Sequence, residues 1–449
     1  MRRVPRVYKQ MKSKRKTLFK YVTPSILSMV SIMLFTIIDG IFVGRGAGTD
    51  ALGAVNIAFP YVMIFTAMVL LVTVGGLTIT AIRIGRDDWD SANISYVHTI
   101  IAAAIVSALF SLFGTVTVKQ VAALMGANAT FFDMVCDYTF WYAVFMIPCG
   151  LYSAFNGFCR NDGDPLLVTI SVVVSTVLNI FGDWLFVFPL HMGLKGAAIA
   201  TGISQTAGLM ITLIHFLRKK GRLRFVRCHF DPALMKKIIV RGLPECVSQF
   251  AAPLEVIFYN IVLLRDLGDR AENVFSVIGY VAAFAIAVFV GTAEGAQPLF
   301  GRSYGAKKEE DLKYYLRSSL LISVVGSLII YVALLFAGRP ICSLYGLDSL
   351  TLEETMKVMP KYSLGFLVQS VTVVLCSYLY STTRTRQALA ISILRSFVLN
   401  TIVIFAMPVL FGPGSIWYAF PLFEGIAMVI AIIVTLYADR NGAITGDSE

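Results

Sequence analysis

Long apolar stretches recur along the whole chain and alternate with short polar segments. Each stretch has 18 or more residues with few charges, which is typical of a helix that crosses a membrane. The hydropathy pattern therefore predicts an all-α integral membrane protein. It predicts twelve transmembrane helices, at Leu18–Val43, Ala54–Ile79, Ile94–Val118, Phe132–Phe158, Pro165–Phe188, Leu194–Leu217, Ile238–Leu264, Val274–Phe300, Leu316–Ala337, Met359–Tyr380, Ala388–Phe411 and Ile416–Tyr437.

The composition agrees with a membrane protein and excludes other classes. Hydrophobic residues make up 57% of the 449 residues and charged residues only 14%, whereas a soluble domain averages about 25% charged residues. A disordered chain would show the opposite balance. The seven cysteines are scattered and form no CxxC pair. Neither a disulfide framework nor a cysteine-bound metal is therefore expected.

The distribution of Lys and Arg predicts the orientation in the membrane. Placing both termini in the cytoplasm puts 29 of the 38 basic residues on the inside and 8 on the outside, as the positive-inside rule requires. Nine of them lie between Arg218 and Arg241. The net charge of +11 is thus explained by orientation in a cell (plasma) membrane. No basic domain is long enough to predict nucleic-acid binding.

The two halves of the chain resemble each other. A shift of 220 aligns Gly75 with Gly295, and a shift of 221 aligns the series Ser171, Ser175, Asn179 with Ser392, Ser396, Asn400. The pattern predicts two pseudo-symmetric six-helix lobes, 1–217 and 238–449, joined by a basic linker, 218–237. Six spans give both lobes the same orientation, as in two-lobed transporters that work by alternating access. A channel is less favoured because it needs no pair of rocking lobes.

Polar residues share one depth in the first lobe. Asp39, Asp183, Asn179, Thr201 and Tyr138 all lie ~6–10 Å from the predicted outer surface at 1.5 Å per helical residue. Ionisable groups inside a membrane are costly and each requires a reason. Two close carboxyls can share a proton or bind a cation, and Na⁺ prefers oxygen ligands such as these. The alternative is that both acids are interfacial residues near the lipid headgroups.

The second lobe offers different acids. Glu255 is expected near the midplane, and Glu294 lies beside Gly295 and before Pro298. A Gly/Pro interruption of a span frees backbone groups and usually marks a cavity. Acids that face such a cavity suit a cationic organic substrate. The alternatives are a hydrogen-bonded carboxyl between helices for Glu255, a structural tie for Glu294, and a packing role for Arg395.

Nothing in the sequence indicates an enzyme or a nucleotide-driven pump. The four His are dispersed, and there is no Walker A sequence and no G-x-S-x-G. No cofactor is expected, and the energy for transport would come from a gradient of Na⁺ or H⁺. The predicted partners are the lipid bilayer and small organic cations, with the protein acting as a monomer.

Five motifs, in this order along nearly the whole chain, resemble the multidrug and toxic compound extrusion (MATE) family. They are "DGIFVGRGAGTDALGAVNIAFP" at 39–60, "NGFCRNDGDP" at 156–165, "LNIFGDWLFVF" at 178–188, "GLKGAAIATGISQ" at 193–205 and "EGAQPLFGRSYGAKK" at 294–308.

The resemblance implies two six-helix lobes and export of organic cations in exchange for Na⁺ or H⁺. One branch of the family has a cation site with acids that match Asp39 and Asp183 and partners that match Asn179 and Thr201. Tyr138 and Asn156 match residues near that site or its drug-binding cavity. Glu294 matches an acid that some bacterial members carry. The branch with a second-lobe site has an acid in span ten, whereas Met359–Tyr380 contains none.

Two other functions compete with the exporter. A flippase for lipid-linked precursors would carry several Arg or Lys within the membrane, and here only Arg395 is a candidate. An integral membrane enzyme would need clustered His, Cys or acids at one interface. The sequence therefore favours a secondary active antiporter that exports cationic amphipathic compounds.

Overall fold

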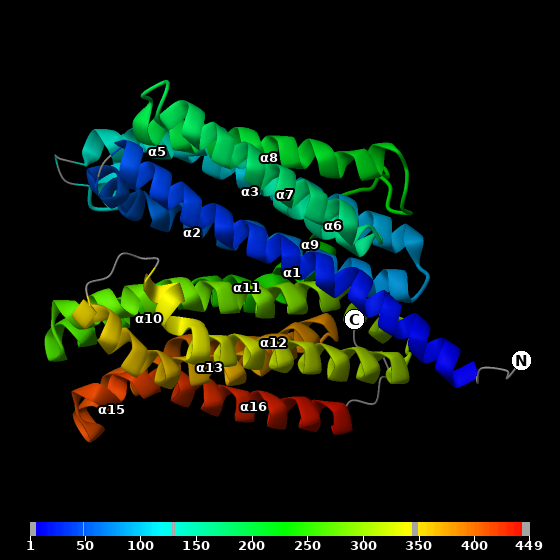
Figure 1. The fold of residues 1–449 in the computed structure, drawn as a ribbon. Coiled ribbons are helices and arrows are strands. Elements are labelled where there is room, and N and C mark those ends of the chain that lie inside the picture. The colour runs from blue at the N-terminus through cyan, green and yellow to red at the C-terminus, as the bar shows by residue number, and fades with distance from the viewer. Residues whose placement is uncertain (1–5, 48, 128, 130, 344–348, 442–449) are drawn as a thin grey trace, which may run out of the picture. The chain divides into compact units, whose positions relative to one another are not determined.

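The computed structural model describes residues 6–47, 49–127, 129, 131–343 and 349–441, and every regular element within these ranges is a helix (Figure 1). The α-helices are α1 (Arg6–Ala47), α2 (Thr49–Gly85), α3 (Trp89–Val116), α4 (Val118–Leu124), α5 (Phe132–Val144), α6 (Met146–Asn161), α7 (Pro165–Val187), α8 (Gly193–Leu217), α9 (Pro232–Gln249), α10 (Ala251–Asp266), α11 (Asp269–Gly305), α12 (Glu309–Ser343), α13 (Ser349–Ser381), α14 (Thr385–Ile393), α15 (Asn400–Phe411) and α16 (Ala419–Asn441). A π-helical segment, η1 (Leu394–Leu399), joins α14 to α15, and a 3₁₀ segment, η2 (Pro413–Tyr418), precedes α16.

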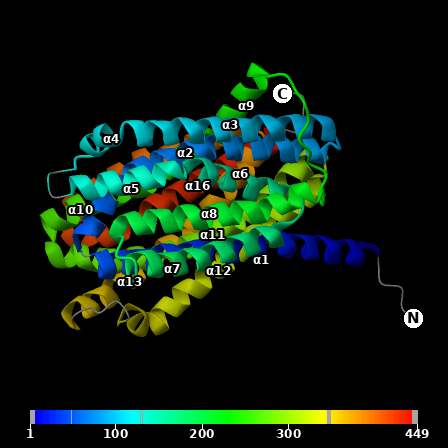
Figure 2. The ribbon, with the colours of Figure 1, turned by 90° about the horizontal axis from the view of Figure 1, so that it is seen from above.

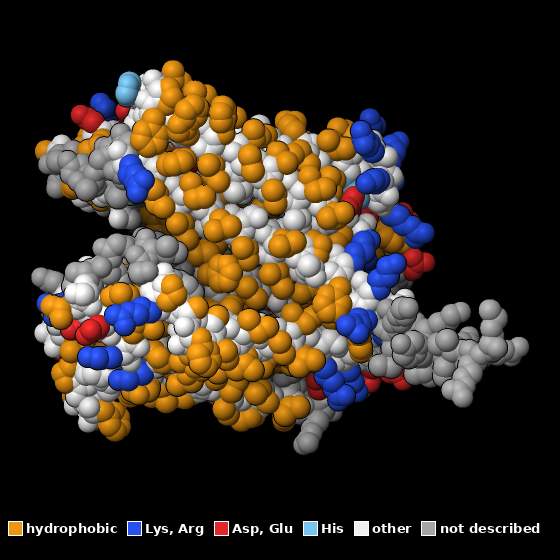
Figure 3. Space-filling view, in the orientation of Figure 1, with side chains coloured by type: hydrophobic (Ala, Val, Ile, Leu, Met, Phe, Trp, Pro, Cys, Tyr) orange, Lys and Arg blue, Asp and Glu red, His pale blue; other side chains and the backbone are white. Residues whose placement is uncertain are grey.

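The predicted all-α membrane architecture is confirmed. Within the described residues, eleven helical spans are long and apolar enough to cross a membrane, and there are twelve if α5 and α6, which meet at a bend of 51°, count as one span. Apolar side chains cover much of the outer surface along the helices (Figure 3). Leu109 and Leu112 on α3, for example, are 61% and 62% exposed. In water these side chains would be unfavourable, so lipid must cover them.

The chain folds into two compact units. The N unit is Leu27–Cys246, and the C unit combines the described residues before Leu27 with those from Val247 onward. In the N unit, α7 lies along α8 and α2 lies along α3 (Figures 1 and 2). The boundaries of these units differ from those of the segments 1–217, 218–237 and 238–449. Those segments were drawn from hydropathy and charge, and they remain a prediction.

The boundary between the units falls at equivalent positions in the two halves of the sequence. The boundaries after Ile26 and after Cys246 are separated by the same offset that aligns Gly75 with Gly295 in the sequence. Consequently α1 begins in the C unit and continues in the N unit, whereas α9 belongs almost entirely to the N unit and α10 to the C unit. Each half of the sequence thus contributes its first helical segment to the unit built mainly from the other half.

Glycines allow these exchanged segments to pack closely. In the N unit, a Cβ at Gly242 of α9 would lie 1.7 Å from the backbone oxygen of Leu71 on α2. In the C unit, a Cβ at Gly291 of α11 would lie 2.6 Å from the Cα of Ile26 on α1. Any side chain at either glycine would force the two helices apart. The small residues therefore define where the exchanged segments cross their neighbours.

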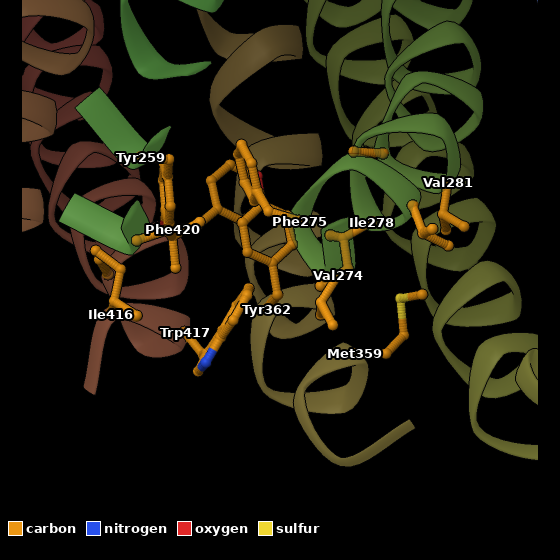
Figure 4. Close-up of a cluster of buried hydrophobic side chains, with 14 of the residues drawn as sticks. Tyr259, Val274, Phe275, Ile278, Val281, Met359, Tyr362, Ile416, Trp417 and Phe420 are labelled. Carbon is orange, nitrogen blue, oxygen red and sulfur yellow. The ribbon is translucent and has the colours of Figure 1, made fainter. Parts of the chain in front are cut away.

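The core of the C unit is a cluster of stacked aromatic rings (Figure 4). Tyr259 stacks on Phe275 with ring centroids 4.6 Å apart, and Tyr362 stacks on Phe420 at 4.5 Å. Offset stacking of this kind adds to the energy of burial. These contacts tie α10, α11, α13 and α16 together.

One local prediction was wrong. Gly295 and Pro298 were expected to interrupt a span, but α11 continues through both to Gly305. A Cβ at Gly295 would lie 2.7 Å from the Cα of Val22 in α1, so this glycine serves helix packing. Neighbouring helices commonly allow a membrane helix to tolerate Pro. The cavity that we inferred from an interruption therefore loses its basis.

Candidate functional site

Two acids meet inside the N unit. Asp39 lies on α1 and Asp183 on α7, and their carboxyl groups are within hydrogen-bonding reach of each other. Asp183 is fully buried, and one oxygen of each carboxyl is buried without a hydrogen-bond partner among the described residues. A buried oxygen of this kind calls for a proton or a cation.

An amide and a hydroxyl extend the acid pair. With its amide nitrogen facing Asp183, Asn179 donates to Asp183 Oδ2 at 2.8 Å. Its oxygen then accepts from the hydroxyl and the backbone nitrogen of Thr201 on α8, at 3.3 and 3.2 Å. The four residues predicted from their common depth, Asp39, Asn179, Asp183 and Thr201, thus form one contiguous cluster. The carboxyl oxygens of the two acids are donors of the kind that hard cations prefer, and the Asn179 amide nitrogen is turned toward Asp183.

The helix α7 presents this cluster on a continuous polar stripe. Ser171, Ser175, Asn179 and Asp183 follow one another at intervals of four residues, and all four are buried. Residues at this spacing lie on one helical face. Ser171 donates to the backbone oxygen of Gly208 on α8 at 2.7 Å. Close packing of α7 against α8, with Gly182 beside Ala200, holds the stripe inside the N unit.

The predicted substrate residues of the N unit lie in two places. Tyr138 on α5 is near enough to both Asp39 and Asp183 for electrostatic interaction. Its ring stacks on that of Tyr142 at 5.9 Å. Asn156 on α6 instead makes a side-chain hydrogen bond with Tyr152. The structure therefore brings Tyr138 to the acid cluster. It places Asn156 near the Ser171 end of the polar stripe, because Tyr152 is hydrogen-bonded to both Asn156 and Ser171.

The predicted acids of the C unit are in different surroundings. Glu255 on α10 accepts a hydrogen bond from the hydroxyl of Tyr362 on α13 at 3.2 Å. Arg395, in the π-helical segment η1, donates to Glu424 on α16 at 2.7 Å, and it also interacts electrostatically with Glu255. Glu294 lies half-buried on α11 and outside this group.

Sequence reasoning missed two residues of these clusters. Glu424 is fully buried on α16, and it is the partner that makes Arg395 tolerable inside a span. An acid within the apolar stretch 416–437 was a signal that hydropathy averaging concealed. Tyr142 follows Tyr138 by one helical turn, and the i, i+4 spacing already predicted that it lies on the same face.

The fold and the buried cluster define a class of protein. A multi-pass helical protein in which ionisable side chains are buried along the spans is typical of a membrane transporter. The chain belongs to the MATE family: the sequence model of the MatE family matches residues 24–185 and again residues 244–406. The starts of the two matches differ by the offset that relates Gly75 to Gly295, in agreement with the repeat seen in the sequence. As a member of this family the protein is a transporter and not an enzyme.

Similar proteins extend over almost the whole chain. The multidrug export protein MepA of Staphylococcus haemolyticus is 21% identical over 435 residues, which cover 95% of this chain and 94% of that protein. An FAD transporter of Shewanella oneidensis is 24% identical over 341 residues, or 74% of each chain. Among solved structures, a mutant of the Vibrio cholerae MATE transporter VcmN superimposes with a TM-score of 0.89 at 20% identity, covering 96% of this chain and 98% of that one.

Proposed function

We propose that this protein is a secondary active antiporter that exports cationic amphipathic compounds in exchange for Na⁺ or H⁺. The observation that carries the proposal is the buried pair Asp39 and Asp183, with Asn179 and Thr201 beside it. Two relatives, 21% and 23% identical to this chain in matches that cover 94% of each relative, are named multidrug export proteins. That name supports export as the direction of transport and drugs or toxins as the substrate class.

The acid pair would couple the ion to the substrate. Two carboxyls in contact cannot both stay ionised unless a proton or cation lies with them. Oxygen atoms of Asp39, Asp183, Asn179 and Thr201 suit Na⁺, and a shared proton satisfies the same pair. Exchange follows if the bound ion and the bound drug favour different arrangements of the two lobes in an alternating-access cycle.

The substrate side of the proposal rests on aromatic and acidic side chains. Tyr138, stacked on Tyr142, supplies a π-face that attracts organic cations. Asn156, Glu255 and Glu294 are the further candidates for substrate binding. Of these, Glu255 combines a carboxyl with the nearby ring of Tyr362, a pairing that suits a flat or quaternary cation.

The location follows from the same family membership and from the charge pattern. We propose a multi-pass protein of the plasma membrane, with both termini in the cytoplasm and a single chain as the working unit. The orientation rests on the distribution of Lys and Arg. Cysteine labelling from the outside at engineered loop positions would test it.

The first test is efflux of a fluorescent organic cation, such as ethidium, from cells with a defined ion gradient. Wild-type protein is compared with Asp39→Asn and Asp183→Asn at equal membrane expression. We expect each variant to slow efflux by about tenfold or more, the effect of losing ~1.4 kcal/mol of ion binding. Imposing Na⁺ and H⁺ gradients separately then identifies the coupling ion.

The matched control is Asp137→Asn, which removes an exposed acid from the same helix as Tyr138 and should leave efflux unchanged. Normal export by Asp39→Asn and Asp183→Asn would show that the coupling site lies elsewhere, with Glu255 next in line. If wild-type protein moves no cation, the proposed substrate class is wrong.

One observation favours a second substrate class. The Shewanella oneidensis relative, matched over 74% of this chain, is named an FAD transporter, and FAD is an anion. Efflux of FAD from the same cells therefore belongs in the first experiment. The flippase alternative has less support, because Arg395 is paired with Glu424 and does not offer a free cation to a pyrophosphate.

A further inference from the structure

The segment that joins α8 to α9, Arg218–Asp231, is held rigidly against the N unit. Asp162, at the end of α6, accepts the backbone N–H groups of Arg222 and Leu223, at 2.9 and 3.2 Å. Asn93 of α3 accepts that of Arg224 at 2.8 Å, and the Leu223 side chain is buried. The segment therefore has a defined surface facing outward, although it is neither helix nor strand.

The far end of the segment is anchored in the same way. His98 of α3 accepts the backbone N–H of Asp231 at 3.0 Å through Nε2, while its Nδ1 donates to the backbone oxygen of Ile94 at 2.8 Å. The ring of His98 stacks on Phe230. Three buried side chains of two spanning helices thus fix the backbone between its two ends.

The outward face combines cations with large aromatic side chains. Arg222 and Lys220 have side chains 69% and 62% exposed, and Arg227 is exposed as well. Phe225 and Phe230 are 60% and 69% exposed. Lys and Arg side chains gather at the end of the N unit where α8 ends (Figure 3). We call these residues, Lys220, Arg222, Phe225, Arg227 and Phe230, the linker patch.

Not every basic residue of the segment is available. The guanidinium of Arg224 turns back to the backbone oxygens of Gly221 and Leu223, at 2.6 and 2.8 Å. Lys220 is paired with Asp164 at 3.3 Å. Arg222 lies over the ring of Trp89 at 5.0 Å, and the nearest acid, Asp87, is 3.9 Å away and 86% exposed. Arg222 and Arg227, together with Arg218 and Lys219 at the start of the segment, therefore remain as exposed cations.

We propose that the linker patch is a docking surface for anionic phospholipid headgroups of the inner leaflet. Arg222 and Arg227 bind lipid phosphates, and Phe225 and Phe230 enter the interface between headgroups and acyl chains. Aromatic rings and basic side chains are both stabilised at this depth, whereas bulk water offers an exposed phenylalanine ring no stabilising contact. The proposal uses the predicted cytoplasmic location of the segment and is independent of the transported substrate.

The lipid partner also fits the charge of the segment. Polybasic segments directly next to a spanning helix are attracted to the negative surface of the cytoplasmic leaflet. The positive-inside rule explains the basic residues of the segment, but it does not explain exposed phenylalanines. A fixed backbone that exposes two Phe next to Arg residues is more than an orientation signal requires.

The test uses the full-length protein in vesicles and the fluorescence of Trp89, which lies beneath Arg222. Vesicles contain brominated phosphatidylglycerol or brominated phosphatidylcholine as quencher. The signal of Trp89 is the difference between wild type and Trp89→Phe. We expect stronger quenching by the anionic lipid, and the variant Arg222→Gln/Arg227→Gln should reduce this preference on the order of tenfold.

The matched control is Lys313→Gln/Arg317→Gln, which removes two exposed cations from α12 in the C unit and should leave the Trp89 signal unchanged. A second variant, Phe225→Ser/Phe230→Ser, should reduce quenching by both lipids. Raising the salt concentration must weaken the wild-type preference, because exposed charges are screened. This measurement on wild type remains valid even if the arginine variant folds poorly.

Three results would overturn the proposal. The first is equal quenching by the anionic and zwitterionic lipids in wild-type protein. The second is an unchanged preference in a well-folded Arg222→Gln/Arg227→Gln variant. The third is loss of the preference in inorganic phosphate at constant ionic strength, because the patch would then bind free anions instead of a membrane. A failure of cation efflux in the earlier experiment would leave this quenching result intact.

Discussion

The buried acids of the two units are balanced by different residues. Asp39 and Asp183 contact each other's carboxyl, the amide of Asn179 donates to Asp183, and the phenol of Tyr138 interacts with both acids electrostatically. In the C unit, Arg395 balances Glu424 through a hydrogen-bonded ion pair. A proton or cation is thus needed by the N unit pair, whereas the C unit supplies its own cation. This contrast supports the proposal that a coupling ion would bind in the N unit.

The ion pair of the C unit predicts an asymmetric effect of mutation. Arg395→Met leaves the carboxylate of Glu424 buried without its partner, which typically costs about 3–5 kcal/mol of stability. The double variant Arg395→Met/Glu424→Leu removes both charges and should recover most of that loss. Thermal unfolding in detergent, followed with a dye that reacts with the buried thiols such as Cys342, measures both. Equal losses in the single and double variants would contradict this account.

The residues of the candidate site were predictable to different degrees. Asp39, Asn179, Asp183 and Thr201 were found because spacing along helices predicts depth, and the structure brings all four together. Asn156 was named from the family resemblance alone, as a residue near that site or its drug-binding cavity, and the structure shows it hydrogen-bonded to Tyr152. Glu424 was missed because one acid barely lowers the hydropathy of a long apolar stretch.

Among the helical elements, two breaks lie shortly before a proline, although other prolines stand inside continuous helices. The bend between α5 and α6 occurs at Phe145, three residues before Pro148, and the break between α9 and α10 at Phe250, three residues before Pro253. A proline removes the hydrogen bond to the residue four positions earlier. Yet α11 runs through Pro298, where a close neighbour, α1, supports it. Sequence predicts the weak point, and packing determines whether the helix bends.

The close helix crossings predict which glycines tolerate a methyl group. Gly242→Ala would place its Cβ 1.7 Å from the backbone oxygen of Leu71, and overpacking of this kind typically costs about 1–3 kcal/mol. Gly279→Ala on α11 has no atom within 4 Å and should stabilise the helix by up to about 1 kcal/mol. The same thermal unfolding assay distinguishes the two. Similar behaviour of both variants would mean that the α2–α9 contact is not tightly packed.

At the scale of the whole molecule, the repeat was visible in the sequence but the exchange between units was not. Hydropathy and the constant offset between matching residues predicted two halves, and the family match at 24–185 and 244–406 shows the same period. Neither hydropathy nor the offset predicts the unit in which a helix packs, because an apolar helix face can pack against any other apolar face. The three-dimensional contacts, among them those of the glycines, place α9 on α2 and the start of α1 on α11.

The exchange predicts that cutting the linker does not separate the halves. A protease site inserted between Lys219 and Lys220, both exposed, would leave α9 in the N unit on one fragment and the start of α1 in the C unit on the other. After cleavage, the two fragments should elute together from a size-exclusion column in mild detergent. Separate elution would show that the exchanged segments contribute little to cohesion. Uncleaved protein carrying the same insertion is the control.

The crossing of segments between the units also bears on whether one repeat could stand alone. A single repeat with this architecture lacks the first helical segment of its own unit, and its apolar face with small glycines is left uncovered. Only a second copy can supply the missing segment, and it would receive one in return. A protein made of one such repeat would therefore need a second copy to be complete, whereas in this chain the basic linker keeps both repeats in one polypeptide.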